Sequence, residues 1–184
     1  MGAYCIAIIS FRYKTHSTFP ILECAGPLSP EVVQSTALSS RYPASNVLIL
    51  GETDANLGNG KYNFWLAGIN GWRGFILRID YCKRLIAGFQ IKNLGKGCCR
   101  VSATDQFQIG GSTKENGPWK ILADYHLDDT RGKPAPLLNF TFDEPVEIQF
   151  IYFELVSYWP GVTDPSWGNR GGLQYFAAIP ATSK

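Results

Sequence analysis

The sequence contains few charged residues and few histidines, and this shortage excludes several classes of function. Charged residues make up 17% of the 184-residue chain, and the net charge is only +2, with both signs mixed along the sequence. This pattern argues against a nucleic-acid-binding protein, which usually carries a strong basic patch. The only two histidines, His16 and His126, are far apart in the sequence, and there is no C-x-x-C pair. A zinc site is therefore not expected.

Long apolar runs are also missing. The stretch AYCIAIIS, residues 3–10, is an apolar run of eight residues with no basic segment before it. It is short for a secretory signal peptide and far too short to span a bilayer. The start, MGAYCI, lacks the Ser or Thr that a myristoylation signal carries at position six. We interpret residues 1–28 as an N-terminal extension, either an extra strand or an ordered leader, and residues 29–184 as one domain.

Motifs that carry catalytic chemistry are absent as well. The chain has no G-x-S-x-G motif, no phosphate-binding loop and no dinucleotide fingerprint. His126 is followed by Asp128 and Asp129 in ADYHLDDTRG, which we interpret as a turn between strands. We therefore expect a protein without catalytic activity. An enzyme on the same scaffold is the alternative, and it requires His126 to lie in a cleft with facing carboxylates.

The cysteines leave two alternatives open. The chain has an odd number, five, so at least one cannot pair within the chain. Two of them are adjacent in the sequence, and each of these would pair more easily with a distant partner than with its neighbour. Both a fully reduced chain and one or two disulfides are compatible with this pattern. The cysteines are Cys5, Cys24, Cys82, Cys98 and Cys99.

What the sequence does contain is a series of short strand patterns. Hydrophobic residues make up 45% of the chain and aromatic residues 14%, which suits a packed β core. Helical periodicity is nearly absent, and the apolar segments are separated by Gly, Pro, Asn and Asp, as in a β-sandwich or barrel. One strand is predicted near residues 31–38. The others are predicted at 74–80, 84–93, 105–111, 119–125, 137–143, 146–158 and 171–179.

The strand patterns also predict how some side chains are distributed. Both faces of 146–158 are apolar, so this strand should be central and buried on both sides. Residues 84–93 should place Leu85, Ala87, Phe89 and Ile91 on one face. Trp65 and Trp119 lie on strand patterns, and we assign both to the core. We expect Gly171 and Gly172, before the last strand, to adopt φ angles that other residues avoid.

Six segments of the chain match the pattern of a known domain family in the right order. They are SSRYPASNVL (39–48), FWLAG (64–68), GFILRIDYCKRLIAGFQIKN (74–93), SATDQFQIGGSTKENGPWKIL (102–122), IYFELVSYW (151–159) and GGLQYF (171–176). Together they resemble the discoidin or coagulation factor five/eight type C family of galactose-binding-like domains, over about residues 31–179. The resemblance implies an all-β, eight-stranded antiparallel jelly-roll sandwich that has no active site and binds sugars, anionic lipid headgroups or proteins through loops at one end.

The resemblance also implies features that this sequence meets only in part. Many members hold a structural Ca²⁺ in the loop before the Trp strand, and here GETDANLGNG (51–60) offers Asp54 and Asn56 as ligands. An ordinary Asp/Asn/Gly turn is the alternative. Extracellular members often join the ends of the domain by a disulfide, which cannot form here because no cysteine follows Cys99. The family favours an extracellular or cell-surface location, whereas the missing signal peptide argues against it unless the chain is a fragment.

The resemblance implies that the ligand is held by loop residues. In galactose-binding relatives the loop after the strand at 84–93 supplies an arginine, and aromatic rings with polar donors hold the sugar. The predicted ligand-binding residues are Tyr62, Trp72, Asn93, Lys96, Arg100, Trp159, Trp167 and Arg170. We therefore expect a lectin-like module for galactose or a related sugar. A protein-interaction module is the alternative, and anionic phospholipid is less favoured because the loops are rich in Gly, Asn and Asp.

Overall fold

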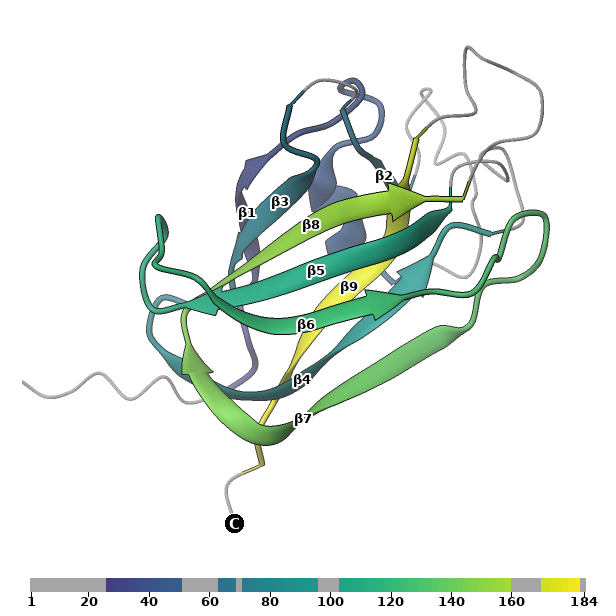
Figure 1. The fold of residues 1–184 in the computed structure, drawn as a ribbon. Coiled ribbons are helices and arrows are strands. Elements are labelled where there is room, and N and C mark those ends of the chain that lie inside the picture. The colour runs from purple at the N-terminus through teal and green to yellow at the C-terminus, as the bar shows by residue number, and fades with distance from the viewer. Residues whose placement is uncertain (1–25, 51–62, 69–70, 96–102, 160–169, 183–184) are drawn as a thin grey trace, which may run out of the picture.

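The computed structural model describes residues 26–50, 63–68, 71–95, 103–159 and 170–182. Within these ranges the chain forms nine strands and one short 3-10 helix (Figure 1). No helix in them has the length and apolar character needed to cross a membrane. The elements are β1 Glu31–Ser35, η1 Ala44–Leu48, β2 Trp65–Leu66, β3 Gly74–Arg78, β4 Arg84–Asn93, β5 Thr104–Ser112, β6 Lys120–His126, β7 Leu137–Ile148, β8 Phe150–Tyr158 and β9 Gly172–Pro180.

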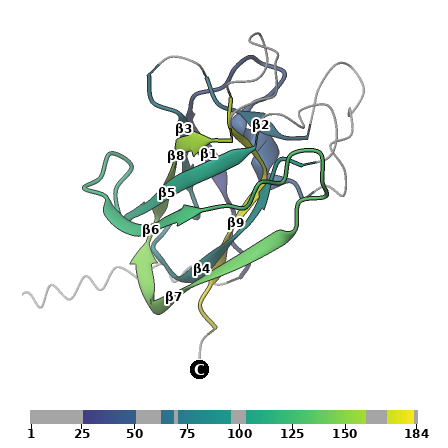
Figure 2. The ribbon, with the colours of Figure 1, turned by 45° about the vertical axis from the view of Figure 1, so that its right-hand side comes forward.

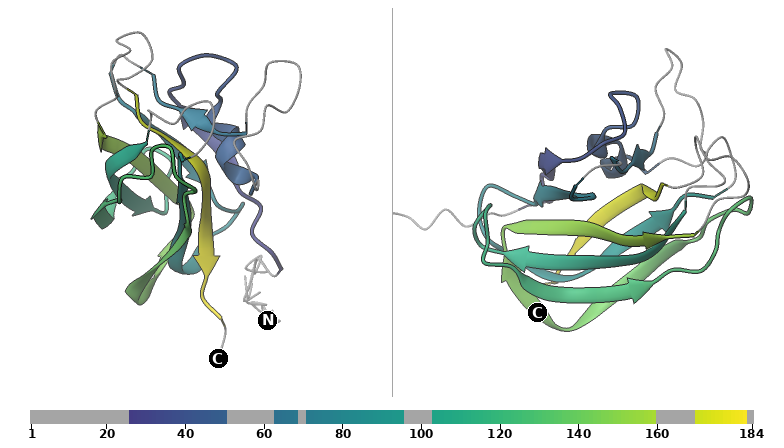
Figure 3. Two further views of the ribbon diagram at one scale, coloured as in Figure 1. Left: turned by 90° about the vertical axis from the view of Figure 1, so that its right-hand side faces the viewer. Right: turned by 45° about the horizontal axis from the view of Figure 1, so that its top comes forward.

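The strands form two antiparallel sheets that face each other. One sheet has the order β1-β3-β8-β5-β6, and the other has the order β2-β9-β4-β7. The two layers are visible in Figures 1 and 2, and the right-hand view of Figure 3 shows β8, β5 and β6 side by side in one layer. The predicted all-β antiparallel sandwich is confirmed. Each of the eight predicted segments overlaps a strand, and the remaining strand is the two-residue β2 in FWLAG.

Aromatic rings fill the space between the sheets. Phe153 of β8 stacks on Phe75 with ring centroids 5.0 Å apart and on Phe107 at 5.4 Å, while Trp65 meets it edge-on at 6.0 Å. All four side chains are fully buried. They come from four different strands, so every second residue along each strand points into the same core. Trp65 therefore lies in the core as predicted, and its indole N–H donates to the backbone oxygen of Thr36 at 2.6 Å.

The predicted strand at 146–158 is divided between two strands. β7 continues through Pro145 to Ile148, and β8 begins at Phe150 and crosses to the other sheet. Proline is tolerated in β7 because β7 is an edge strand, where one side of the backbone needs no partner. β8 is the middle strand of its sheet, with Ile151, Phe153 and Leu155 buried inward. The predicted central strand is thus correct from residue 150 onward.

A β-bulge in β4 overturns the predicted face of one residue. Leu85 was expected inside with Phe89 and Ile91, but it is 55% exposed, and its neighbour Ile86 is fully buried. The pairing of β4 with both neighbouring strands shifts register between Ile86 and Gly88. An extra residue in a strand moves the following side chains to the opposite face. Strict alternation along the sequence therefore placed Leu85 on the wrong side.

The two glycines where β9 begins, Gly171 and Gly172, are required for close packing. Neither Gly171 nor Gly172 has a positive φ angle. The prediction that they adopt φ angles that other residues avoid is therefore wrong. A Cβ at Gly171 would overlap the side chain of Leu155, and one at Gly172 would overlap the backbone oxygen of Trp65. Glycine here lets β9 approach β2 and β8 closely enough to close the sandwich.

Four strand ends meet at one end of the sandwich. Asn93 at the end of β4 pairs with Leu173 near the start of β9, and Thr104 at the start of β5 pairs with Tyr158 at the end of β8. The Thr104 hydroxyl donates to the backbone oxygen of Gly172 at 2.8 Å and joins the two sheets there. We refer to this region as the loop end.

The opposite end of the sandwich holds the start of the described chain. The backbone oxygen of Gly26 accepts a hydrogen bond from the guanidinium of Arg84 at 2.7 Å, and Leu28 packs against the main core. Cys82, between β3 and β4, is disulfide-bonded, which settles the open question of whether all cysteines are reduced. The division at residue 28 between extension and domain stays a prediction.

Candidate functional site

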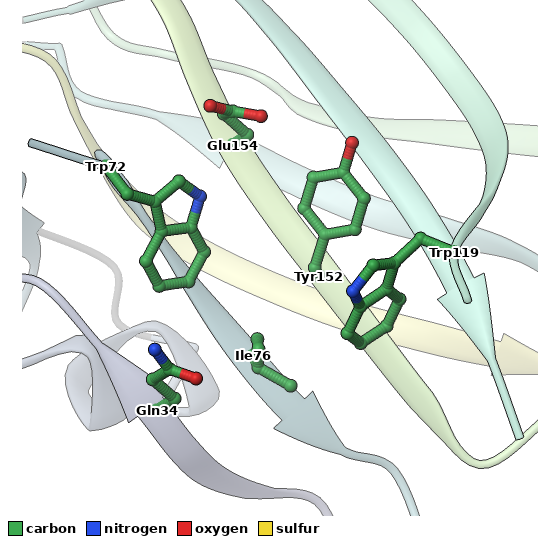
Figure 4. Close-up of a pocket in the computed structure, with 6 residues that line it drawn as sticks. All are labelled: Gln34, Trp72, Ile76, Trp119, Tyr152 and Glu154. Carbon is green, nitrogen blue, oxygen red and sulfur yellow. The ribbon is translucent and has the colours of Figure 1, made fainter. Parts of the chain in front are cut away.

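A groove lies on the outer face of the five-stranded sheet, away from the core between the sheets (Figure 4). Its volume is about 320 Å³, which is the lower end of the range for small-ligand sites. Aromatic rings line it on two sides, an aliphatic side chain forms part of the floor, and polar groups lie at the edge. We call it the outer groove. It is lined by Gln34, Trp72, Ile76, Trp119, Tyr152 and Glu154.

Strand register brings the floor of the outer groove together. Gln34 of β1 pairs with Ile76 of β3, Ile76 pairs with Tyr152 of β8, and Tyr152 pairs with Gly110 of β5. These residues form one row across the sheet, and their side chains point to the same face. Ile76, Phe150 and Tyr152 form a buried apolar cluster of their own on this face, separate from the main core.

Two tryptophans frame this cluster. Trp72 precedes β3, and its ring lies over Gly74, where a Cβ would approach the ring to 2.8 Å. Trp119 precedes β6 and meets Tyr152 edge-on with centroids 5.2 Å apart. Both tryptophans are half-buried and pack against the outer cluster. The assignment of Trp119 to the core is wrong, because it lies just before its strand and packs on the outside of the sheet.

Gly110 makes room for the Tyr152 ring. A Cβ at position 110 would overlap the ring. The ring can therefore lie flat across β5, with its hydroxyl donating to Oε1 of Gln108 at 2.6 Å. Glycine at position 110 of β5 is therefore needed for the Tyr152 ring to take its place in the outer groove.

We expect Gly110→Ala to displace Tyr152 and to deform the outer groove. Overpacking of this kind costs about 1–3 kcal/mol of folding free energy, and the Tyr152–Trp119 contact should be lost with it. Urea unfolding measures the loss of folding free energy, and ligand titration measures the effect of the deformed groove on binding. Gly68→Ala is the control, since a Cβ there meets its neighbours only at 3.6 Å and should leave both unchanged. A Gly110→Ala variant with normal stability and binding would contradict this role.

A row of amides and carboxylates continues from Tyr152 across the sheet. Gln108 and Gln106 donate to the two oxygens of Asp124 at 3.4 and 2.8 Å. Burial raises the pKa of Tyr152, and the nearby charges of Glu154 and Asp124 raise it further. The Tyr152 hydroxyl therefore stays protonated and keeps its role as a donor. The Glu154 carboxylate is half-exposed at the edge of the groove, with no hydrogen-bond or ion-pair partner among the described residues.

The loop end contains three of the predicted ligand-binding residues. Asn93 is buried, and its side chain bonds both backbone groups of Thr104 and the N–H of Leu94, so it fastens β4 to β5. Trp159 is half-buried and donates its indole N–H to the backbone oxygen of Leu127 at 3.1 Å. Arg170 is half-buried just before β9.

A charged pair supports Trp159. The guanidinium of Arg131 lies 5.9 Å from the centre of the Trp159 ring and forms an ion pair with Asp129 at 2.7 Å. The hydrogen bond from Arg131 lowers the pKa of Asp129 to about 2. Asp129 therefore stays ionised at all ordinary pH values, and its contribution to stability is lost only as the pH falls from about 4 toward 2.

Several predicted residues lie outside the described ranges. Tyr62, Lys96, Arg100 and Trp167 fall there, and so do Asp54 and Asn56, the possible calcium ligands. Of the predicted ligand-binding residues that the structure describes, Trp72 alone lines the outer groove. Among the described residues, no group of three His, Cys, Asp or Glu side chains is placed to hold a metal.

His126 does not form the arrangement that the enzyme alternative requires. Its ring is 68% exposed and contacts Asp105 at 3.1 Å instead of Asp128 or Asp129. Ser157 donates to the other oxygen of Asp105 at 2.8 Å, so Asp105 bridges the serine and the histidine. Burial acts to raise the pKa of Asp105, but the hydrogen bonds from His126 and Ser157 outweigh it and lower the pKa.

Comparison with known proteins identifies the fold. No protein-family model matches the chain, and no curated protein matches it either. Among solved structures, the family 32 carbohydrate-binding module of EndoD from Streptococcus pneumoniae has a TM-score of 0.58 at 14% identity, covering 84% of this chain and 97% of the module. The family 32 module of NanJ from Clostridium perfringens, in complex with galactose, has a TM-score of 0.52 at 14% identity, covering 82% and 92%.

A second Clostridium perfringens module, in complex with GalNAc-β-1,3-galactose, has a TM-score of 0.54 at 10% identity, covering 83% of this chain and 94% of that one. At this sequence identity the similarity shows the fold alone. The chain thus has the galactose-binding-like β-sandwich fold that the sequence motifs predict.

Sequence reasoning missed most of the outer groove. Its residues are distant in the sequence, and only register brings Gln34, Ile76 and Tyr152 into one row. One signal was present: the second apolar face of β8 contains an aromatic residue at 152 and a carboxylate at 154. An apolar outer face on a central strand must be covered or must bind something.

Proposed function

We propose that this chain is a non-catalytic glycan-recognition module and that the outer groove holds the sugar. The observation that carries this proposal is the convergence of three aromatic side chains, from separate segments, around an apolar floor with polar groups at the edge. A pyranose ring has an apolar face of C–H groups and a rim of hydroxyls. The aromatic rings offer a surface to the first, and directional amide and carboxylate groups suit the second.

The polar groups of the groove can hold hydroxyls in fixed directions. Gln34 is exposed at one side, where its amide can donate and accept. Glu154 at the other side accepts hydrogen bonds only. Tyr152 is held in place by its bond to Gln108, so its ring is positioned before any ligand binds. Such preorganisation reduces the entropy lost on binding.

The described lining of the groove favours binding over hydrolysis. Glycoside hydrolysis requires two carboxyl groups that face each other across the scissile bond. Among the described residues that line the outer groove, Glu154 is the only carboxylate. The solved modules of this fold that hold galactose and GalNAc-β-1,3-galactose are carbohydrate-binding modules, which supports the same kind of function here.

The proposal is tested by titrating the intact protein with a panel of neutral, amino and acidic sugars, with and without calcium. We expect saturable binding of at least one sugar and no release of reducing ends during long incubation. Absence of binding to every sugar would overturn the proposal. A partner protein captured at the groove, and not displaced by free sugars, would favour the alternative of a protein-interaction module, since Trp and Tyr also dominate protein interfaces.

A further inference from the structure

The outer groove has a negative charge that no described residue neutralises. Glu154 lies at its edge without an ion-pair partner among the described residues, and Asp124 lies farther along the same face, two strands away. Both charges act on the Tyr152 hydroxyl between them. No described residue that lines the groove is a lysine or an arginine.

Three described cations in or next to this sheet make other contacts or line another site. Arg78 of β3 forms an ion pair with Glu31 and lies over the ring of Tyr81. Arg73 lies over the ring of Tyr158, 5.7 Å from its centre. Lys120 lines a separate crevice between β6 and β7. The carboxylate of Glu154 is therefore available to a cation that the ligand supplies.

Aromatic rings beside a carboxylate form a suitable site for an ammonium group. Trp and Tyr faces attract cations through their quadrupoles, and the attraction is stronger where water is excluded. Trp72 lies over Gly74, and Gly74 is the cross-strand partner of Glu154. The Trp72 ring and the Glu154 carboxylate thus border the same part of the groove (Figure 4).

We propose that the outer groove selects glycans with a free amino group over their N-acetylated and acidic counterparts, with the sugar ring on the aromatic side chains and the ammonium at Glu154. This inference rests on the proposed glycan-binding function. N-acetylation removes the positive charge and adds volume, and a carboxylate on the sugar would face Glu154 and Asp124 as a like charge. Either change lowers the electrostatic complementarity.

The test compares four sugars: D-galactosamine, D-glucosamine and the N-acetyl form of each, titrated by NMR at a pH where the amine is protonated. We expect the preferred amino sugar to bind about tenfold more tightly than its N-acetyl form, a ratio that corresponds to one charge-assisted contact. The preference should decrease with added salt, because the site is partly exposed.

Glu154→Gln should reduce this ratio to about one, because it keeps the shape of the side chain and removes its charge. Glu144→Gln, at an exposed position of β7 in the other sheet, is the matched control and should leave the ratio unchanged. Equal binding of both forms by the native protein, or a ratio unaffected by Glu154→Gln, would overturn the inference but leave glycan binding intact. Absence of binding to these four sugars and to the whole neutral and acidic panel would overturn the proposed function as well.

Discussion

Replacement of Trp72 by alanine is expected to weaken glycan binding by roughly 5- to 150-fold. The estimate takes about 1–3 kcal/mol for one stacking contact, as measured for bases on aromatic side chains, at about 1.4 kcal/mol per tenfold. Trp72 forms one wall of the outer groove and lies outside the main core. The variant should therefore fold normally and lose affinity, which calorimetric titration and thermal unfolding measure separately.

Trp159→Ala is the matched control for Trp72→Ala. Trp159 is also half-buried and lies at the loop end, where its indole N–H bonds Leu127. We expect this variant to lose some stability and to keep its affinity for the sugar. The opposite pattern, with affinity lost in Trp159→Ala and kept in Trp72→Ala, would place the sugar at the loop end and contradict the outer groove.

Replacement of Phe153 by alanine is expected to cause the largest loss of stability. Truncation of a buried phenylalanine costs about 3–5 kcal/mol, because the transfer free energy is lost and a cavity remains. Phe153 stacks on Phe75 and Phe107, which come from the two neighbouring strands. It also meets Phe176 of the facing sheet edge-on, with ring centroids 6.1 Å apart. A cavity here removes the common neighbour of these three rings, so relaxation should recover little.

The free energy of unfolding in urea measures this effect. Val156→Ala on the same strand is the control, because Val156 is 47% exposed and its truncation should change stability by no more than about 0.5 kcal/mol. A loss of less than about 1 kcal/mol in Phe153→Ala would show that the two sheets do not depend on this aromatic contact.

Most of the fold could be predicted from local patterns. The segments 84–93, 105–111 and 171–179 alternate or carry apolar runs between turn residues, and each forms a strand close to its predicted bounds. The errors occur where the backbone departs from simple alternation. The bulge between Ile86 and Gly88 turned Leu85 outward. Which residue is extra in a bulged strand depends on its partner strand, and the sequence of β4 alone does not contain this information.

The candidate site could be predicted only in part. Trp72 was identified as an aromatic residue of the predicted loop INGW, 69–72. Tyr152 and Glu154 were hidden in the longest apolar strand, and their importance depends on Gly110 and Gly74, which lie opposite them in neighbouring strands. Trp119 was assigned to the core because the seven-residue pattern starting there resembles a strand, whereas β6 begins one residue later.

The indole N–H signals of the tryptophans, followed by NMR during titration with the preferred amino sugar, test the location of the site most directly. The signals of Trp72 and Trp119 should shift with a common saturation curve, because both rings line the outer groove. Those of Trp65, buried in the core, and Trp159, at the loop end, should stay in place. A shift of Trp159 with Trp72 and Trp119 unchanged would contradict binding in the outer groove.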